Sequence, residues 1–409
     1  MIPRFKPWLG WAELSAVFRP NIGAVERFEK EFARTFNAVE AVSFPYGRSA
    51  LWAFLNAVGV RDAEVVMPAY TCSVVAHAIS LSGNRPRFVD IRLGDYNMDL
   101  DLLSAALNER TRAVVATHLF GYPLDLSRLE AIISEAEIRY GNKIWLIQDC
   151  AHSFGATWKG RLVGNSGDVA LYGLNISKMI TSIFGGMLTF TNASLAAQVR
   201  SWRDATFTSP SWRKEWQRRF YLIAVYIAFS KPIYGFTWWL QQNTSLLNRL
   251  TDSYHLDDKI HFPPDYKEKM LNIESAVGLE QLKKYPKIIA KRRSIAKYYN
   301  LNLPNNTNWI LPPMIEGATY SHYVVRVTDR RGCVLKMAAL GLHLGELIQY
   351  SVAELGAYKH FDSVCPIADY VSRNTINIPI TEKVSISFFA KLNLSKLITT
   401  SELDRVHKP

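Results

Sequence analysis

The sequence lacks any apolar run long enough to cross a lipid bilayer. Its longest uninterrupted apolar segment, residues 220–229, would span about 15 Å as a helix, roughly half of a hydrocarbon core. Residues 1–18 also lack the continuous apolar core of a signal peptide. Cysteine is scarce, and neither metal-ligand spacing nor a disulfide pattern is found among Cys72, Cys150, Cys333 and Cys365. We therefore expect reduced thiols, no metal site and a cytoplasmic protein.

Acidic residues are in short supply. Lysine and arginine number 48 against 36 aspartates and glutamates, which gives a net charge of +12 over 409 residues. This balance suits an anionic partner such as a phosphate, a nucleotide or an acidic membrane surface, although a solvated basic surface is the simpler alternative. No zinc-binding, helix-turn-helix or RNA-binding signature is found, so we expect no nucleic-acid partner.

Strand-like and helix-like segments alternate through the first two-thirds of the chain. The strand-like segments are 63–71, 85–91, 112–121 and 143–149, and the helix-like segments between them are 73–83, 100–111 and 125–141. This alternation predicts an α/β fold with a mostly parallel sheet between helices. Ligands bind such sheets beyond the carboxyl ends of the strands, so the residues that follow each strand are the places to search.

The first such place is a turn formed by Gly47, Arg48 and Ser49 at the start of a helix-like segment. A helix N-terminus offers unpaired N–H groups and a partial positive charge, and glycine allows an anion to come close. The turn therefore indicates a phosphate-binding site. An ordinary connection between a loop and a helix is the alternative.

The second place contains Asp149, at the end of a strand, and His152, three residues later. A carboxylate in this position can pair with a protonated ring nitrogen of a ligand, and the histidine can contact the same ring. The alternative is a helix-capping aspartate beside a hydrogen-bonded core histidine.

The third place is the apolar stretch 171–190, which contains a single lysine, Lys178, followed by Gly185 and Gly186. Burial disfavours the charged form of an amine, and a neutral amine can attack a carbonyl to form a Schiff base. A lysine that extends to the surface is the alternative. Taken together, a phosphate cradle, a carboxylate for a ring nitrogen and a nucleophilic lysine are the parts needed to hold pyridoxal 5'-phosphate (PLP).

The motifs around these residues, above all 148–178 and 185–192, resemble the DegT/DnrJ/EryC1/StrS family of fold-type I, PLP-dependent aminotransferases. The resemblance implies a large PLP-binding α/β domain over 1–265 with a mixed sheet, a smaller α+β domain over 266–409, and a homodimer. It breaks over about 205–262, where we expect an apolar insertion. Segments 321–327 and 345–351 of the smaller domain are expected at the mouth of the active site.

By this resemblance Lys178 forms the Schiff base with the cofactor and moves the substrate proton, Asp149 keeps the pyridine nitrogen protonated, and His152 lies beside the ring. Residues 47–49 take the place of the phosphate-binding turn. The implied reaction carries an amino group from glutamate or glutamine to a keto-sugar, linked to a nucleotide in most family members. Surface polysaccharide, glycolipid or secondary-metabolite biosynthesis is the implied setting.

Three positions depart from the family pattern. Gly173 stands where the family has a phosphate-binding serine, and Arg48, Asn175 and Ser177 are the candidates to compensate. Cys72 stands where an aromatic residue usually stacks on the cofactor ring, with Tyr70 two residues earlier. Lys267 aligns with an asparagine that reaches the neighbouring subunit. These departures leave open a catalytically inert scaffold that serves as a sensor or structural protein.

The segment 218–242 combines a short apolar run with basic residues before it and Trp238 and Trp239 near its end. Such flanks are typical of a helix or re-entrant loop in a membrane interface. In that case the protein would lie at the inner face of the membrane and its substrate would be lipid-linked. The alternative is a segment buried in a dimer interface or under the sheet.

Overall fold

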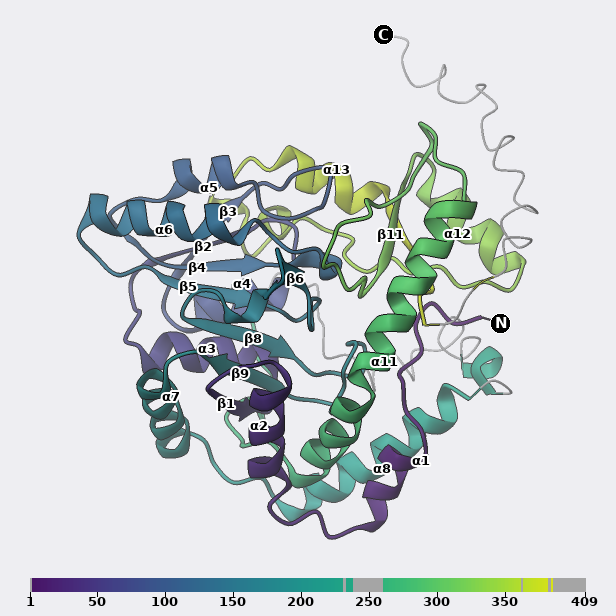
Figure 1. Ribbon diagram of the computed structural model, residues 1–409, viewed down its shortest axis with the longest axis horizontal. Coiled ribbons are helices and arrows are strands. Elements are labelled where there is room, and N and C mark those ends of the chain that lie inside the picture. Colours follow the sequence, from purple (N-terminus) through teal and green to yellow (C-terminus); the bar gives the residue numbers. More distant parts are fainter. Residues whose placement is uncertain (1, 231–232, 238–259, 362, 382–383, 385–409) are drawn as a thin grey trace.

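A seven-stranded sheet forms the centre of the computed structural model, which describes residues 2–230, 233–237, 260–361, 363–381 and 384. The strand order is β1-β9-β8-β5-β4-β2-β3, and only β9 runs against the others. The strands are β1 (Glu40–Phe44), β2 (Glu64–Pro68), β3 (Arg85–Val89), β4 (Thr111–Thr117), β5 (Trp145–Asp149), β8 (Val169–Gly173) and β9 (Gly186–Phe190). The predicted mostly parallel sheet is therefore confirmed (Figure 1).

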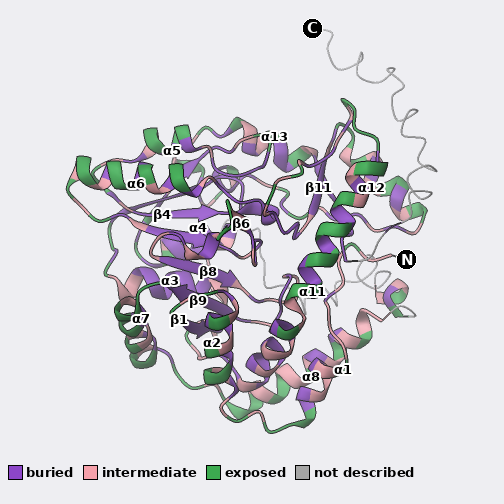
Figure 2. Cartoon of the chain, viewed as in Figure 1, coloured by how far each residue is buried: buried purple, intermediate pink, exposed green. Residues whose placement is uncertain are grey.

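Helices cover both faces of this sheet because successive strand residues point to opposite sides. One face packs against α3 (Gly47–Ala57), α4 (Ser73–Leu81) and α7 (Ala193–Thr206). The other face packs against α2 (Ala24–Thr35), α5 (Leu100–Ala106) and α6 (Leu126–Tyr140). Figure 2 shows the buried sheet between helices whose outer sides are exposed. The predicted helix over 100–111 ends earlier, at Ala106, because Thr111 already begins β4.

A second, three-stranded sheet lies in the later part of the chain. It consists of β10 (Trp309–Ile310), β11 (Tyr323–Val327) and β12 (Thr375–Ile378), all antiparallel. The helices α11 (Asn272–Asn302), α12 (Arg330–Ala339) and α13 (Pro366–Asn374) accompany it. Pro286 lies inside α11 without ending it. The predicted domain boundary at residue 265 stays a prediction.

Several short elements complete the described chain. They are α1 (Trp11–Ser15), the hairpin strands β6 (Thr157–Trp158) and β7 (Arg161–Leu162), and the 3₁₀ helices η1 (Ala16–Phe18), η2 (Leu119–Gly121), η3 (Val163–Asn165), η4 (Val352–Glu354) and η5 (Lys359–Phe361). The hairpin and the buried strand β8 follow β5 along the chain.

The predicted insertion contains α8 (Trp212–Ala228), which lies beside α1 and α11 rather than under the large sheet (Figure 1). Leu222 is buried in a small cluster with Ile183, Leu271 and other apolar residues, and Val225 is also buried. The rest of the apolar run is partly or fully exposed. Trp238 and Trp239 lie outside the described residues. No helix in the described ranges is both long enough and apolar enough to cross a membrane.

Candidate active site

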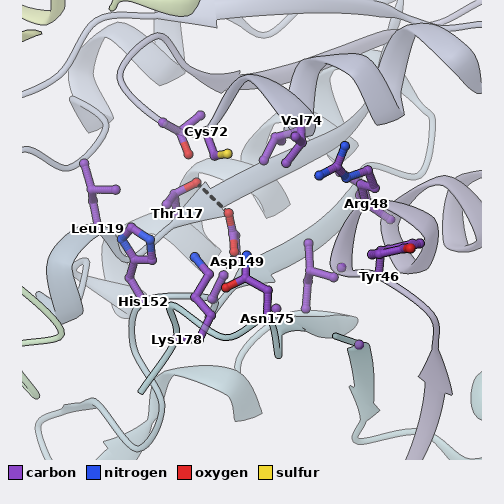
Figure 3. A pocket seen from close by; sticks show the side chains of 18 residues that line it. Tyr46, Arg48, Cys72, Val74, Thr117, Leu119, Asp149, His152, Asn175 and Lys178 are labelled. Atoms are coloured by element: carbon purple, nitrogen blue, oxygen red, sulfur yellow. Dashed lines mark hydrogen bonds between the residues drawn. The ribbon is translucent and has the colours of Figure 1, made fainter. Parts of the chain in front are cut away.

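A cavity that is partly open to solvent lies at the carboxyl ends of the parallel strands. Its lining comes from residues directly after β1, β2, β4 and β5 and from the loop between β8 and β9 (Figure 3). The cavity therefore lies where the strand pattern predicted a ligand.

Lys178 enters this cavity from the loop between β8 and β9. Figure 3 shows its side chain between His152 and Asn175, directed toward Asp149. Its Nζ makes no hydrogen bond or salt bridge within the described part of the chain. Burial lowers the pKa of the Lys178 amine, while the negative forms of Cys72 and Asp149 partly oppose this shift. The amine is therefore easier to deprotonate than an exposed lysine.

The loop that holds Lys178 is tightly fixed. Ile183 has a φ of 75°, a conformation that a β-branched residue rarely adopts, and its side chain is fully buried. The Lys178 backbone N–H donates to the carbonyl of Asn175 at 3.0 Å. Buried packing at one end of the loop and a closed turn at the other restrict the positions open to the amine.

Asp149 ends β5 directly opposite Thr117, the last residue of β4. Its carboxylate accepts hydrogen bonds from the Thr117 hydroxyl at 3.3 Å and from the backbone N–H of Ala151 at 3.0 Å. Burial raises the pKa of Asp149, and these two hydrogen bonds and Lys178 oppose the shift. A cationic group of a ligand beside this carboxylate would lower its pKa again.

His152 forms the part of the cavity wall beside Lys178 (Figure 3). Its ring stacks on Phe120, with 6.0 Å between ring centroids, and lies 5.2 Å from the ring of His322. Burial, Lys178 and His322 together hold its pKa well below the usual value, so the ring is neutral. Its Nδ1 is buried without a hydrogen-bond partner among the described residues. His152 thus offers a flat neutral face and one unused polar atom.

A helix N-terminus borders the opposite end of the cavity. Gly47 begins α3, and a Cβ atom on it would lie only 3.3 Å from the Cα of Gly173, so the two backbones approach closely. Arg48 lines the cavity and is buried. In Figure 3 its guanidinium lies across the cavity from His152. This arrangement concentrates positive potential at one end of the site.

Sequence reasoning missed a second helix N-terminus in the same wall. Cys72 is the N-cap of α4, and Thr71, Val74 and Val75 line the cavity beside it. Tyr350 accepts a hydrogen bond from the backbone N–H of Ser73 at 3.0 Å. Strand β2 ends at Pro68, five residues before α4 begins at Ser73, and this short connection between a strand and an apolar helix was the available signal. Of the two segments expected at the mouth of the active site, His322 contacts the His152 ring and Tyr350 bonds to Ser73, while no residue of either segment lines the cavity.

Three expected contacts take other positions. Ser49 is fully buried in α3 and does not line the cavity, and its Oγ has no hydrogen-bond partner in the described ranges. The Ser177 hydroxyl donates to Oδ1 of Asn175 at 2.6 Å, so it supports Asn175, which does line the cavity, instead of entering it. Tyr70 is buried and donates to the Ile348 carbonyl at 3.3 Å, which leaves Cys72 to face the cavity.

The structure thus gathers most of the predicted site residues and leaves two outside. The cavity is lined by Gly47, Arg48, Cys72, Asp149, His152, Asn175 and Lys178. Ser49 and Ser177 lie behind this lining. Local packing decides the orientation of both side chains. The Ser49 side chain is buried on α3, and the Ser177 hydroxyl closes a short turn by bonding to Asn175.

Comparison with known proteins identifies relatives of this chain. The chain is 26% identical over 328 residues to the GDP-perosamine synthase of Caulobacter vibrioides, covering 78% of this chain and 74% of that protein. The sugar aminotransferase CalS13 from Micromonospora echinospora superposes with a TM-score of 0.77 at 22% identity, covering 97% of this chain and 100% of that one. The PLP form of Spr1654 from Streptococcus pneumoniae gives a TM-score of 0.73 at 21% identity, with 97% and 100% covered.

These likenesses confirm the predicted fold, a fold-type I PLP-dependent transferase with a mixed sheet between helices. The model of the DegT/DnrJ/EryC1/StrS aminotransferase family matches residues 20–391, which is most of the chain. The protein therefore belongs to the DegT/DnrJ/EryC1/StrS aminotransferase family, and it is an aminotransferase.

Proposed function

We propose that this aminotransferase uses PLP to move an amino group from glutamate or glutamine to a keto-sugar linked to a nucleotide. One observation carries the proposal: Lys178, Asp149 and two helix N-termini surround a single cavity. A relative named GDP-perosamine synthase supports a nucleotide-linked acceptor. Relatives with this name and with a spore coat polysaccharide function support a role in surface polysaccharide biosynthesis.

The residues around the cavity fit PLP group by group. The Lys178 amine, with its lowered pKa, is suited to bind the aldehyde carbon. The Asp149 carboxylate is suited to hold a proton on the pyridine nitrogen. The N-termini of α3 and α4, together with Arg48, are suited to bind the phosphate. When bound, PLP supplies an electron-withdrawing ring that stabilises negative charge on the neighbouring substrate carbon.

Each of these side chains has a separate task in the proposed reaction. Lys178 accepts and returns the proton at the substrate carbon, for which a neutral amine is required. Thr117 and Ala151 hold the Asp149 carboxylate in place, where it would bind the ring nitrogen. His152 would pack a neutral face against the ring, and its Nδ1 would be available to bond a polar substituent.

Arg48 takes the place of the phosphate contacts that the family pattern assigns to a serine at position 173. Gly173 has no side chain to offer, and Ser177 is engaged with Asn175. Arg48 lines the same cavity and is buried, so its charge is weakly screened by solvent. We also propose a homodimer and a boundary between the two domains near residue 265.

Labelling of the purified protein tests the cofactor assignment. We expect a visible absorbance band after incubation with PLP, and borohydride reduction followed by peptide mapping should place the label on Lys178. Addition of glutamate or glutamine should bleach the band. The Lys178→Ala variant is the control. A band that persists with every amino donor would identify an inert scaffold, and a label at another lysine would overturn the site assignment.

A screen of acceptors tests the substrate class. Bleached protein is mixed with nucleotide-linked keto-sugars and, in parallel, with lipid-linked keto-sugars, and recovery of the visible band is measured. Recovery with the nucleotide-linked compounds is expected. Recovery only with the lipid-linked compounds would contradict the proposed acceptor while leaving the aminotransferase assignment intact.

A further inference from the structure

Helix α8 presents large apolar side chains to solvent. Trp212, Trp216, Phe220 and Ile227 are 70%, 51%, 65% and 47% exposed. Their spacing of four, four and seven residues places them along one side of the helix. A helix on the surface of a globular protein normally directs its apolar side toward the core. The outward side of α8 is therefore the apolar one.

Two basic residues of α8, Lys214 and Arg218, point inward and fix this orientation. Lys214 Nζ lies 2.7 Å from a carboxylate oxygen of Asp265 and 3.0 Å from one of Glu268. Arg218 Nε lies 3.1 Å from Oε1 of the buried Glu274. Both basic side chains are largely buried. Rotating α8 to hide its aromatic side would break these ion pairs, so the exposure of that side is built into the fold.

Two aromatic residues near the N-terminus extend the apolar side of α8. Trp11 and Phe18 are 76% and 77% exposed, and the Trp11 ring lies 6.3 Å from that of Tyr226. Phe18, Trp216 and Phe220 line one shallow hollow between η1 and α8. Figure 1 shows α1 beside α8 at the edge of the molecule. We define the α8 face as Trp11, Phe18, Trp212, Trp216, Phe220 and Ile227.

Basic side chains border the α8 face. Arg19 and Arg213 are exposed, and the Arg213 guanidinium lies 5.6 Å from the Trp212 ring centroid. Arg219, next to Trp216, is paired with Glu215 at 3.0 Å, so that pair adds no net charge. The whole chain carries +12. An apolar surface rich in tryptophan with an arginine border matches the chemistry of an anionic membrane interface.

We propose that the α8 face rests on the surface of an anionic lipid bilayer, with α8 parallel to the membrane plane. At 17 residues α8 is about 25 Å long, so it lays its apolar side along the boundary between headgroups and acyl chains. A second copy of this chain fits less well. A two-fold contact through this face would bring Arg19 and Arg213 of both copies together, and like charges repel.

Co-sedimentation of the full chain with vesicles tests this proposal without any substrate, so its result does not depend on the proposed function. We expect binding to vesicles rich in phosphatidylglycerol, weaker binding to pure phosphatidylcholine, and a further decrease at high ionic strength. The double variant Trp216→Glu/Phe220→Glu should lower the bound fraction by about tenfold or more. The conservative double variant Trp216→Leu/Phe220→Leu should retain most of the binding.

The matched control is Ile138→Glu/Val364→Glu, which adds the same charge at two exposed apolar residues elsewhere. It should bind vesicles like the unmodified chain. Circular dichroism checks that each variant is folded. If the unmodified chain stays in the supernatant with both vesicle types, or if the control loses as much binding as the α8 variant, the proposal is overturned. Self-association that the α8 variant abolishes, without lipid binding, would assign the face to a second copy.

Discussion

Replacement of Arg48 by alanine should weaken PLP binding in a way that depends on the phosphate. Arg48 is buried in the cavity wall, so a hydrogen bond from its guanidinium to a phosphate is little screened by solvent. A charge-assisted hydrogen bond contributes about 1.5–3 kcal/mol. At about 1.4 kcal/mol for each factor of ten, the Kd for PLP should rise about 10- to 150-fold.

Absorbance titration of the cofactor-free protein measures this effect. Pyridoxal, which has no phosphate, should bind Arg48→Ala and the unmodified protein alike, and Arg48→Lys should lie between the two proteins for PLP. A PLP Kd within twofold of the unmodified value would refute the reasoning. An equal loss of PLP and pyridoxal binding would refute it too, since the effect would then arise from a damaged cavity.

The Gly173→Ser substitution provides the complementary test of this assignment. A Cβ at position 173 would lie 3.4 Å from Cε of Lys178 and 3.5 Å from Cβ of Ala151, which are ordinary contact distances. The serine therefore fits and adds a hydroxyl beside the start of α3. In the Arg48→Ala background it should recover about tenfold in PLP affinity. Failure to recover any affinity in a folded double variant would place the phosphate elsewhere.

The remaining predictions concern the charged groups of the interior. Lys178→Met should raise the Tm of the cofactor-free protein by about 2 °C or more, because burial lowers the pKa of the amine. Below pH 10.5 the Lys178 amine binds its proton more readily in the unfolded chain than in the folded one. The Tm difference between Lys178→Met and the unmodified protein should therefore shrink as the pH rises toward 10.5 and vanish above it. A Tm difference that does not change with pH would contradict the stated cause. Asp149→Asn should reduce turnover about 10²–10³-fold in steady-state assays while the protein stays folded, and unchanged turnover would remove Asp149 from the reaction. Arg203→Met should cost about 3 kcal/mol in urea unfolding, because the buried Glu29 loses a 2.7 Å ion pair and keeps the ion pair with Arg200 and two hydrogen bonds from Ser43. A loss below about 0.5 kcal/mol would show that these remaining contacts suffice.

The amino-acid sequence by itself determined the strand and helix order and the end of the sheet that carries the site. The predicted strand segments 112–121 and 143–149 are local signals, and the parallel arrangement of such strands brings their ends together. The spacing around Lys178 was also sufficient to identify the family. These features depend on periodicity and on motif spacing, which are properties of a linear chain.

Only the tertiary structure decided which side chains enter the cavity. Ser177 and Asn175 are two positions apart, yet only Asn175 lines the cavity. The Ser177 hydroxyl instead donates a hydrogen bond to Asn175. Tyr70 could not be distinguished from Cys72 by sequence, because its direction is set by contacts with Ile348 and Thr375, about 300 residues away. The orientation of α8 has the same origin. Its aromatic side faces outward because Lys214 and Arg218 pair with Asp265, Glu268 and Glu274, and the positions of such distant partners follow from how the whole chain packs.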